Sequence, residues 1–205
     1  QVHCRLAVLP LFLLASVHGQ EYDLVLSGGR IVDGPETRGI SGLAVSGDRI
    51  AAIGRLAGAA AKQKIDARGL VIAPGFIDIH THARGGIFRT PTAENYVRQG
   101  VATLIEGQDG GSPWPTGAFL KKLAEAGISV NFGIFAGQGT IRQAVIGLEN
   151  RRATADEIRK MKELVRQAMQ EGALGLSSGL FYVPGNFTPP EEVVESGLES
   201  MLMSM

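Results

Sequence analysis

The pattern of apolar and polar positions changes at residue 74 and divides the chain into two parts. In the first part, short runs of alternating apolar and polar residues are separated by turn signals, which is typical of short strands. The runs and their turns are residues 22–33 around Gly28-Gly29, residues 41–54 around Gly47-Asp48, and residues 63–73. The first two runs predict hairpins, and the third predicts two further short strands. Residues 20–73 thus predict a small β unit that is too thin to bury a core alone.

From Pro74 onward, short buried strands alternate with amphipathic helices. The predicted strands are residues 74–82, 100–107, 128–137 and 172–180, and the predicted helices are residues 91–99, 115–127 and 154–171 and a helix after Pro189-Pro190. Thr154 with Glu157 three residues later forms a capping box, which marks the start of the long helix. Strands that alternate with helices pair in parallel through right-handed crossovers, so residues 74–205 predict an α/β architecture.

Four strand–helix units are half of what a closed eightfold barrel requires. After the last predicted helix the chain ends in MLMSM, with no capping residue and no following strand. A half barrel leaves an unpaired strand edge and apolar surface exposed. We therefore expect the 205 residues to be a fragment, the first half of a TIM-like (β/α)8 barrel. A complete open sheet of four parallel strands is the alternative.

The first residues have the character of a targeting segment. Arg5 is followed by an apolar run ending at Val17, which is too short to span a bilayer but has the length of a signal-peptide core. Val17 and Gly19 are small residues that suit cleavage after Gly19. Residues 1–19 are thus predicted to be a signal peptide, with a secreted or periplasmic protein and no membrane attachment after its removal. A buried N-terminal helix is the alternative.

Charge and composition exclude several classes of protein. The 20 Lys and Arg residues balance 20 Asp and Glu residues, whereas a protein that binds nucleic acid or anionic membranes would carry a basic excess. Cys4 is the only cysteine, which excludes a disulfide framework and any cysteine-based zinc site. Glycine-rich phosphate-binding motifs are not present in the sequence.

His80 and His82 are the strongest candidates for chemistry. They end the first strand of the alternating part, and residues i and i+2 of a strand point to the same face. In a barrel, this end of a strand meets the active face. Two imidazoles on one face are a good start for a divalent transition-metal site, most often zinc. The HxH spacing alone is a weak signal, because paired histidines are more often structural.

Several segments carry a family resemblance. APGFIDIHTH (residues 73–82) resembles the first-strand metal motif of the amidohydrolase superfamily. The preceding β unit resembles the small β-sandwich segment that comes before the barrel there. QGVATLIEGQDGGSP and EGALGLSSGLFYVPGNFTPPEEV resemble, more narrowly, the N-acyl-D-amino-acid deacylases, or D-aminoacylases. The likeness covers about residues 22–195 and implies a metal-dependent hydrolase with a small β-sandwich segment at residues 20–73.

The resemblance implies that His80 and His82 are metal ligands for one or two zinc ions. The family commonly has a cysteine ligand just beyond the second strand, where this chain has Asp109. A carboxylate can bind zinc, so Asp109 is one candidate for the third ligand. Glu106 is the other, because a buried carboxylate needs a metal, a cation or a proton. An ordinary turn or helix-cap role is the alternative for both.

The loop after the fourth predicted strand contains Tyr182. Similar deacylases have a tyrosine there that helps to hold the substrate, and packing on the barrel rim is the alternative. Ser177 and Ser178 resemble nucleophiles, but no histidine or lysine base is identifiable nearby, so we expect hydrogen-bonding residues at a strand end. Residues 172–180 contain no lysine that could become a carboxylated bridging ligand, which argues against the hydantoinase and dihydroorotase types.

The resemblance implies that the parent protein hydrolyses the amide bond of a small molecule, an N-acyl-D-amino acid or a dipeptide-like amide. The general-base Asp and the remaining metal histidines of the family are expected beyond Met205, so no catalytic base is assigned within the chain. Two alternatives stay open. One is a non-catalytic truncated fragment, and the other is an amidohydrolase that acts on cyclic amides or aryl amines.

Overall fold

The chain divides into two units at the peptide bond between Pro74 and Gly75. A computed structural model describes residues 21–34, 37–56 and 58–203. The division lies one residue from the boundary expected from the sequence. The predicted signal peptide, residues 1–19, lies outside the described residues.

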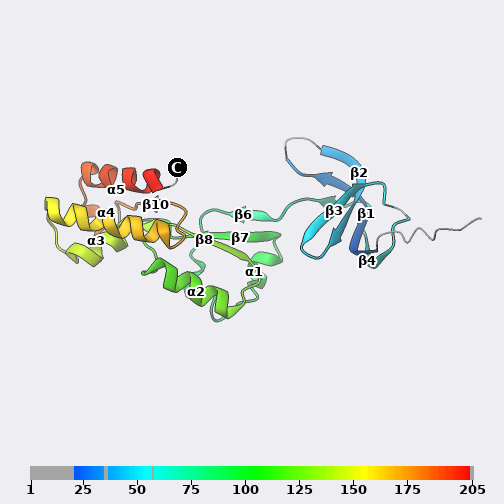
Figure 1. Ribbon diagram of the computed structural model, residues 1–205, viewed down its shortest axis with the longest axis horizontal. Helices are drawn as coiled ribbons and strands as arrows, with labels where there is room; N and C mark the ends of the chain where they lie inside the picture. The colour runs from blue at the N-terminus through cyan, green and yellow to red at the C-terminus, as the bar shows by residue number, and fades with distance from the viewer. Residues whose placement is uncertain (1–20, 35–36, 57, 204–205) are drawn as a thin grey trace, which may run out of the picture. The chain divides into compact units, whose positions relative to one another are not determined.

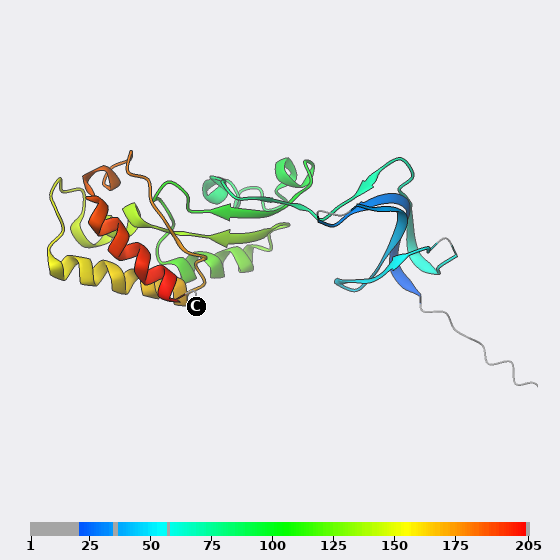
Figure 2. The same ribbon diagram turned by 90° about the horizontal axis from the view of Figure 1, so that it is seen from above.

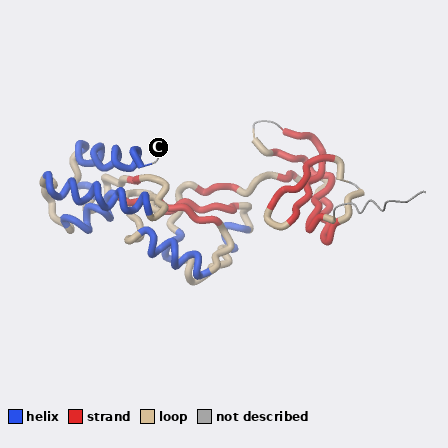
Figure 3. Tube along the Cα trace, viewed as in Figure 1, coloured by secondary structure: helices blue, strands red, loops and turns tan. Residues whose placement is uncertain are grey.

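The described residues of the first unit form a five-stranded mixed sheet (Figures 1 and 3). Its strands are β1 (Tyr22–Val32), β2 (Thr37–Ser46), β3 (Arg49–Gly54), β4 (Ala61–Asp66) and β5 (Val71–Ile72). The order is β3-β2-β1-β4, and β5 also pairs with β1. β2 is antiparallel to both β1 and β3, whereas β4 and β5 run parallel to β1. These residues supply one sheet, whereas the expected β-sandwich needs a second sheet that faces it.

The hairpin predicted at Gly28-Gly29 is wrong. β1 runs through both glycines as one strand, and its pairing with β2 shifts register between Ser27 and Gly29. Gly28 has φ +78°, and a Cβ there would lie 2.6 Å from Cγ of Arg68. The glycines therefore accommodate an irregularity in the strand instead of reversing the chain. The hairpin predicted at Gly47-Asp48 is confirmed as the β2–β3 connection, and the two short strands in 63–73 correspond to β4 and β5.

The second unit has the predicted alternation of strands and helices (Figure 3). Its strands are β6 (Phe76–Asp78), β7 (Val101–Glu106), β8 (Asn131–Ile134), β9 (Ala136–Gly137) and β10 (Leu176–Ser177). Its helices are η1 (Ala83–Gly85), α1 (Glu94–Val97), α2 (Thr116–Ala126), α3 (Gln138–Ile146), α4 (Ala155–Gln170), η2 (Gly185–Phe187) and α5 (Pro190–Met203). All strand pairs of this unit are parallel, as predicted.

The predicted third strand connects the two sheets of this unit. β6, β7 and β8 pair in that order, and β9 pairs with β10. Between β8 and β9, the Phe135 amide donates to the Glu106 carbonyl (2.8 Å), and the next amide, of Ala136, donates to the Gly175 carbonyl (2.9 Å). The four predicted strands therefore lie side by side in sequence order, with the third one changing partner at Phe135.

Two elements differ from the sequence prediction. The helix predicted at 91–99 is the four-residue α1, flanked by turns, and α3 at Gln138–Ile146 was not predicted. α3 begins with Gln138-Gly139 and has no side-chain cap, so local signals are weak. It is stabilised by tertiary packing, because Ile141 and Ile146 are buried against α4.

Two clusters of buried side chains hold the second unit together. α2 packs on the β6–β7–β8 sheet, with Leu123 of the helix against Leu104 of β7 in one cluster (Figure 2). α3 and α4 form the second cluster, which includes Met161 and Val165 of α4. α4 begins with the predicted capping box, which is confirmed. Among the described residues, no helix combines the length and the apolar character that a membrane span requires.

Candidate metal centre

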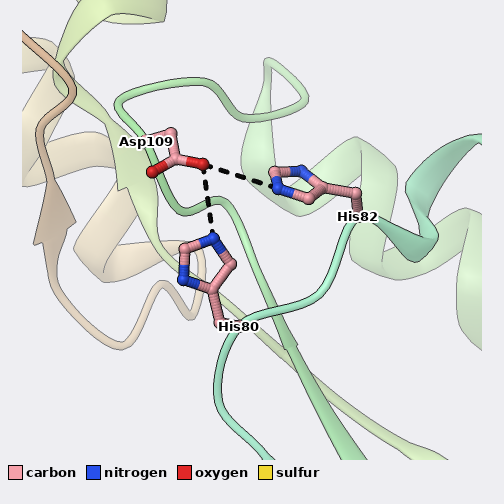
Figure 4. A group of neighbouring side chains, drawn as sticks. All are labelled: His80, His82 and Asp109. Atoms are coloured by element: carbon pink, nitrogen blue, oxygen red, sulfur yellow. Dashed lines mark hydrogen bonds and ion pairs between the residues drawn. The ribbon is translucent and has the colours of Figure 1, made fainter. Parts of the chain in front are cut away.

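His80 and His82 lie just beyond β6, at its carboxyl end. Thr81 between them is buried, and both its backbone amide (3.1 Å) and its hydroxyl (3.0 Å) donate to the Ile105 carbonyl of β7. β6 ends at Asp78, so the prediction of a strand that extends to His82 is wrong. The two imidazoles nevertheless lie on one side, because both face Asp109 (Figure 4). Their ring centroids are 5.5 Å apart. The same-face arrangement predicted from the HxH spacing is therefore confirmed.

Asp109 joins the two histidines from the loop that follows β7 (Figure 4). Its Oδ2 lies 3.3 Å from Nε2 of His80 and 3.5 Å from Nε2 of His82. Asp109 has φ +60°, a left-handed conformation that is uncommon for residues other than glycine. This conformation places the carboxylate over the ends of two neighbouring strands.

The loop that carries Asp109 is fixed by close backbone packing. A Cβ on Gly179 would lie 2.0 Å from the Asp109 carbonyl oxygen, so only glycine allows the two segments to approach this closely. The Gly110 carbonyl next to it accepts a hydrogen bond from the Thr140 amide of α3 (3.1 Å). Gln108 donates through its side-chain amide to the carbonyl of Ile79, which follows β6, and to the carbonyl of Ile105 in β7. The loop thus contacts all four strand–helix units.

The three side chains fit a zinc ion by the chemistry and spacing of their donor atoms. One ligand atom from each lies within 4.8 Å of the other two. Zinc binds imidazole nitrogen and carboxylate oxygen at about 2.0–2.2 Å, so ligand atoms around a tetrahedral ion are separated by about 3.3 Å. The measured nitrogen–oxygen distances of 3.3 and 3.5 Å match that separation. Three protein ligands and an exposed fourth position are typical of a catalytic zinc site.

Glu106, the other candidate ligand, is not part of this group. Its side chain is 0 % exposed, and its Oε1 accepts from Nη1 of Arg84 at 3.1 Å. Oε2 accepts from the Arg84 backbone amide (3.0 Å), and Oε1 also accepts from the Gly107 amide (3.1 Å). A buried carboxylate needs one of three partners: a metal, a cation or a proton. Here the structure supplies a cation, the Arg84 guanidinium. A metal is therefore not required to explain the burial of Glu106.

Tyr182 borders the same cavity as the candidate metal centre, although it is distant in sequence. With Asp109 it lines a cavity of about 330 Å³, to which His82, Arg84, Gln108 and Gly111 also contribute. Its ring makes an edge contact with Phe181 at a centroid distance of 5.5 Å. Ser177, by contrast, donates its hydroxyl to the Gly107 carbonyl, so it is a hydrogen-bonding residue at a strand end as predicted.

Sequence reasoning missed Arg84 and Gln108. Arg84 follows the second histidine by two residues in HTHARGG, and the requirement of Glu106 for a cation was the signal that could have found it.

A second cavity of about 230 Å³ borders His82 and Tyr96. Burial raises the pKa of the Tyr96 hydroxyl, and the negative charges of Asp78 and Glu106 raise it further. The phenol is therefore neutral at pH 7.

Comparison with known proteins now identifies the family. The family model described as "Amidohydrolase family" matches residues 63–192, which include the histidines and Asp109. The chain belongs to the amidohydrolase family. Within that family, D-aminoacylase from Alcaligenes xylosoxydans xylosoxydans is 39% identical over 200 residues, which cover 86% of this chain and 41% of that protein.

Two solved structures resemble this amidohydrolase closely. A structure of D-aminoacylase, reported with a binuclear metal centre, has a TM-score of 0.81 and 33% identity, and the match covers 89% of this chain and 44% of that one. N-acyl-D-glutamate deacylase from Bordetella bronchiseptica, complexed with zinc and a phosphonate inhibitor, has a TM-score of 0.84 and 28% identity over the same shares. The mixed α/β fold thus matches that of D-aminoacylase, and the chain spans less than half the length of these relatives.

Proposed function

We propose that the whole protein is a zinc-dependent hydrolase that cleaves the amide bond of N-acyl-D-amino acids. The observation that carries this proposal is the group formed by His80, His82 and Asp109 beside an open cavity. It occurs in an amidohydrolase chain that is 39% identical to a D-aminoacylase. The N-acyl-D-glutamate deacylase structure contains zinc, which supports zinc as the metal here.

The described residues of the second unit are proposed to form the first half of a TIM-like (β/α)8 barrel. Four parallel strands in sequence order support this proposal, because barrel strands follow one another in that way. The edge strand β6 and its extension expose large apolar side chains: Phe76 (65 %), Ile77 (63 %) and Ile79 (71 %). An apolar strand edge of this kind suits a position against further strands or helices of the whole protein.

Within this chain, His80, His82 and Asp109 would hold the metal and Tyr182 would contact the substrate. Bound zinc would polarise the amide carbonyl and lower the pKa of a bound water. The Asp109 carboxylate also lies at hydrogen-bond distance, 3.3 Å, from the His80 imidazole and 3.5 Å from that of His82, which would keep the three donors together before a metal binds. A carboxylate base outside residues 1–205 is proposed to take the proton of the water and pass it to the leaving amine. Among the described residues these three donors form one group for one ion, and a second ion would need further ligands from the whole protein.

The proposed location is secreted or periplasmic, on the basis of the apolar run that ends at Val17. Expression of the natural gene with a C-terminal tag, followed by fractionation and N-terminal sequencing, tests this proposal. A mature N-terminus at Gln20 is expected. A cytosolic protein that keeps residues 1–19 would contradict it.

The activity is tested on the protein encoded by the complete natural gene, loaded with zinc. We expect release of the free amino acid from N-acetyl-D-leucine or N-acetyl-D-glutamate and none from the L-enantiomers. Hydantoin and dihydrouracil are the discriminating substrates for the cyclic-amide alternative. Turnover of these substrates alone would replace the deacylase proposal. A folded, zinc-loaded protein that is inactive on both classes would favour the non-catalytic alternative.

A further inference from the structure

Arg84 is held rigidly beside the candidate metal centre by a fully buried carboxylate. Its Nη1 donates to Oε1 of Glu106 (3.1 Å) and to the Gly111 carbonyl (2.7 Å), and its backbone amide donates to Oε2 of Glu106 (3.0 Å). The same carboxylate therefore fixes both the main chain and the guanidinium of Arg84. An arginine held in this way loses little side-chain entropy when it binds a further group.

The Arg84 side chain also borders the cavity beside the candidate metal centre. The Arg84 side chain remains 38 % exposed and lines the cavity of about 330 Å³ together with His82, Asp109 and Tyr182. Both recorded side-chain hydrogen bonds of Arg84 are made by Nη1, and among the described residues none is recorded for Nε or Nη2. Gly111 lies beside Nη2, where even a Cβ would approach to 3.6 Å. Nε and Nη2 of Arg84 are thus available to a ligand.

We propose that Arg84 is a specificity-determining residue that binds a carboxylate of the substrate. A planar guanidinium with two free donor nitrogens matches a carboxylate, which it can bind through two parallel hydrogen bonds. Glu106 neutralises the charge of Arg84 but accepts only from Nη1 among its side-chain nitrogens, so Nε and Nη2 stay available to a ligand. His82 and Asp109 border the same cavity, so a ligand bound to Arg84 would share this cavity with the candidate metal ligands.

The inference rests on the proposed function for the identity of the ligand, which is an N-acyl-D-amino acid. Such a molecule presents an α-carboxylate, and acidic members present a second carboxylate on the side chain. Both have the same recognition chemistry. N-acetyl-D-leucine carries only the first carboxylate, and N-acetyl-D-glutamate α-amide carries only the second, so the two compounds distinguish the sources.

Binding is measured by calorimetry on the metal-free whole protein, so that neither zinc nor turnover contributes. N-acetyl-D-leucine is compared with its amide, N-acetyl-D-leucinamide, which lacks the charge. Arg84→Lys keeps a cation for the buried Glu106 but removes the planar fork. The double variant Arg84→Gln, Glu106→Gln removes both charges without leaving one unpaired, which protects the fold. Arg98→Lys is the matched control, because Arg98 forms an exposed pair with Glu94 away from the cavity.

The acid is expected to bind about 10- to 100-fold more tightly than the amide, because a hydrogen-bonded charge is worth about 1.5–3 kcal/mol. Both Arg84 variants should reduce this preference to within about threefold. Arg98→Lys should keep the preference of the unaltered protein, and all variants should keep its zinc affinity. If Arg84 binds the side-chain carboxylate of the substrate, the Arg84 variants should instead lose affinity for N-acetyl-D-glutamate α-amide. With active enzyme, the variants should raise KM more than they lower kcat.

Equal binding of the acid and the amide by the unaltered protein, together with no preference for N-acetyl-D-glutamate α-amide, would overturn the inference. A preference that survives in both Arg84 variants would also overturn it. An Arg84-dependent preference in a protein that hydrolyses no N-acyl-D-amino acid would support the inference while refuting the proposed function. The two proposals therefore fail separately.

Discussion

At the scale of single residues, the geometry of the candidate metal centre depends on the backbone conformation of Asp109. The two histidines come directly after β6, but the third candidate donor is a residue with φ +60°, between Gln108 and Gly110 in a loop. Its carboxylate adds a hard oxygen donor to a group that would otherwise offer only imidazole nitrogens. This mixed donor set suits zinc and other first-row divalent metals.

Replacement Asp109→Asn should weaken zinc binding at least about tenfold, because the charged donor becomes a neutral amide. Calorimetric titration with zinc measures the effect. Asp48→Asn changes an exposed carboxylate in the β2–β3 turn and should leave the zinc affinity unchanged. Equal zinc affinity in the Asp109 variant and the unaltered protein would show that Asp109 is not a ligand.

Replacement Gly179→Ala should also weaken zinc binding, although Gly179 has no side chain to offer. The added methyl group would lie 2.0 Å from the Asp109 carbonyl oxygen, so the loop has to move and the carboxylate moves with it. We expect a loss of affinity of about tenfold or more, comparable to the loss of a supporting group. Gly197→Ala in α5 is the control, because a Cβ there meets no atom within 4 Å. An unchanged zinc affinity for Gly179→Ala would contradict the proposed role of the close packing.

At the scale of elements, the start of α4 combines a local signal with an ion pair. The Thr154 hydroxyl accepts from the Glu157 amide (3.3 Å), and the Glu157 carboxylate accepts from the Thr154 amide (2.8 Å). Arg151 donates to both carboxylate oxygens of Glu157, at 2.8 and 2.7 Å. These contacts lower the pKa of Glu157 to about 2, first through Arg151 and then through the Thr154 amide.

The stabilisation by Glu157 should therefore depend on pH. Because its pKa is lower in the folded chain than in the unfolded chain, its contribution is complete above about pH 4.5 and is lost as the pH falls toward 2. Glu157→Gln should lower the melting temperature at pH 7, and the difference from the unaltered protein should shrink toward zero at about pH 2. Glu163→Gln, on the same helix, should show no such trend. A difference that is constant with pH would contradict the assigned cause.

At the scale of the whole molecule, every ligand of the candidate metal centre lies in the second unit. Loops after two of its strands supply the ligands, and the Asp109 loop packs on the segment that follows β10. A metal that binds only the folded site stabilises the unit that contains it. The strands of the first unit contribute no ligand among the described residues.

Zinc and its removal should thus affect the two units differently. At a free zinc concentration of about 100 times the dissociation constant, the folded second unit should gain about 2.7 kcal/mol. Hydrogen exchange read by mass spectrometry should show slower exchange near residues 79–84 and 107–111 with zinc, and a return to the metal-free rate with EDTA. Peptides from β1 to β4 serve as the internal control. Protection that is equal in both units, or absent from 107–111, would contradict this assignment.

Local signals were sufficient for much of the element pattern and for part of the site. The Gly47-Asp48 hairpin, the capping box of α4 and the shared face of His80 and His82 depend on residues a few positions apart, and all three are confirmed. The hairpin at Gly28-Gly29 failed because a glycine pair is compatible with a turn or with a strand irregularity. Only the pairing of β1 with β2 decides between them.

Sequence alone therefore determined the alternating α/β pattern, and it predicted HxH as a candidate metal motif with two carboxylates that could complete the site. It left Asp109 and Glu106 as equivalent candidates, because Glu106 ends the second strand of the alternating part and Asp109 follows it by three residues. Only the tertiary structure separated them, through contacts between segments far apart in the chain. Arg84 neutralises Glu106. Gly179 packs on the Asp109 loop, in which the Asp109 carboxylate lies 3.3 Å from Nε2 of His80. A strand pattern specifies which face a side chain takes, but charge pairing and backbone packing depend on what the folded chain brings beside it.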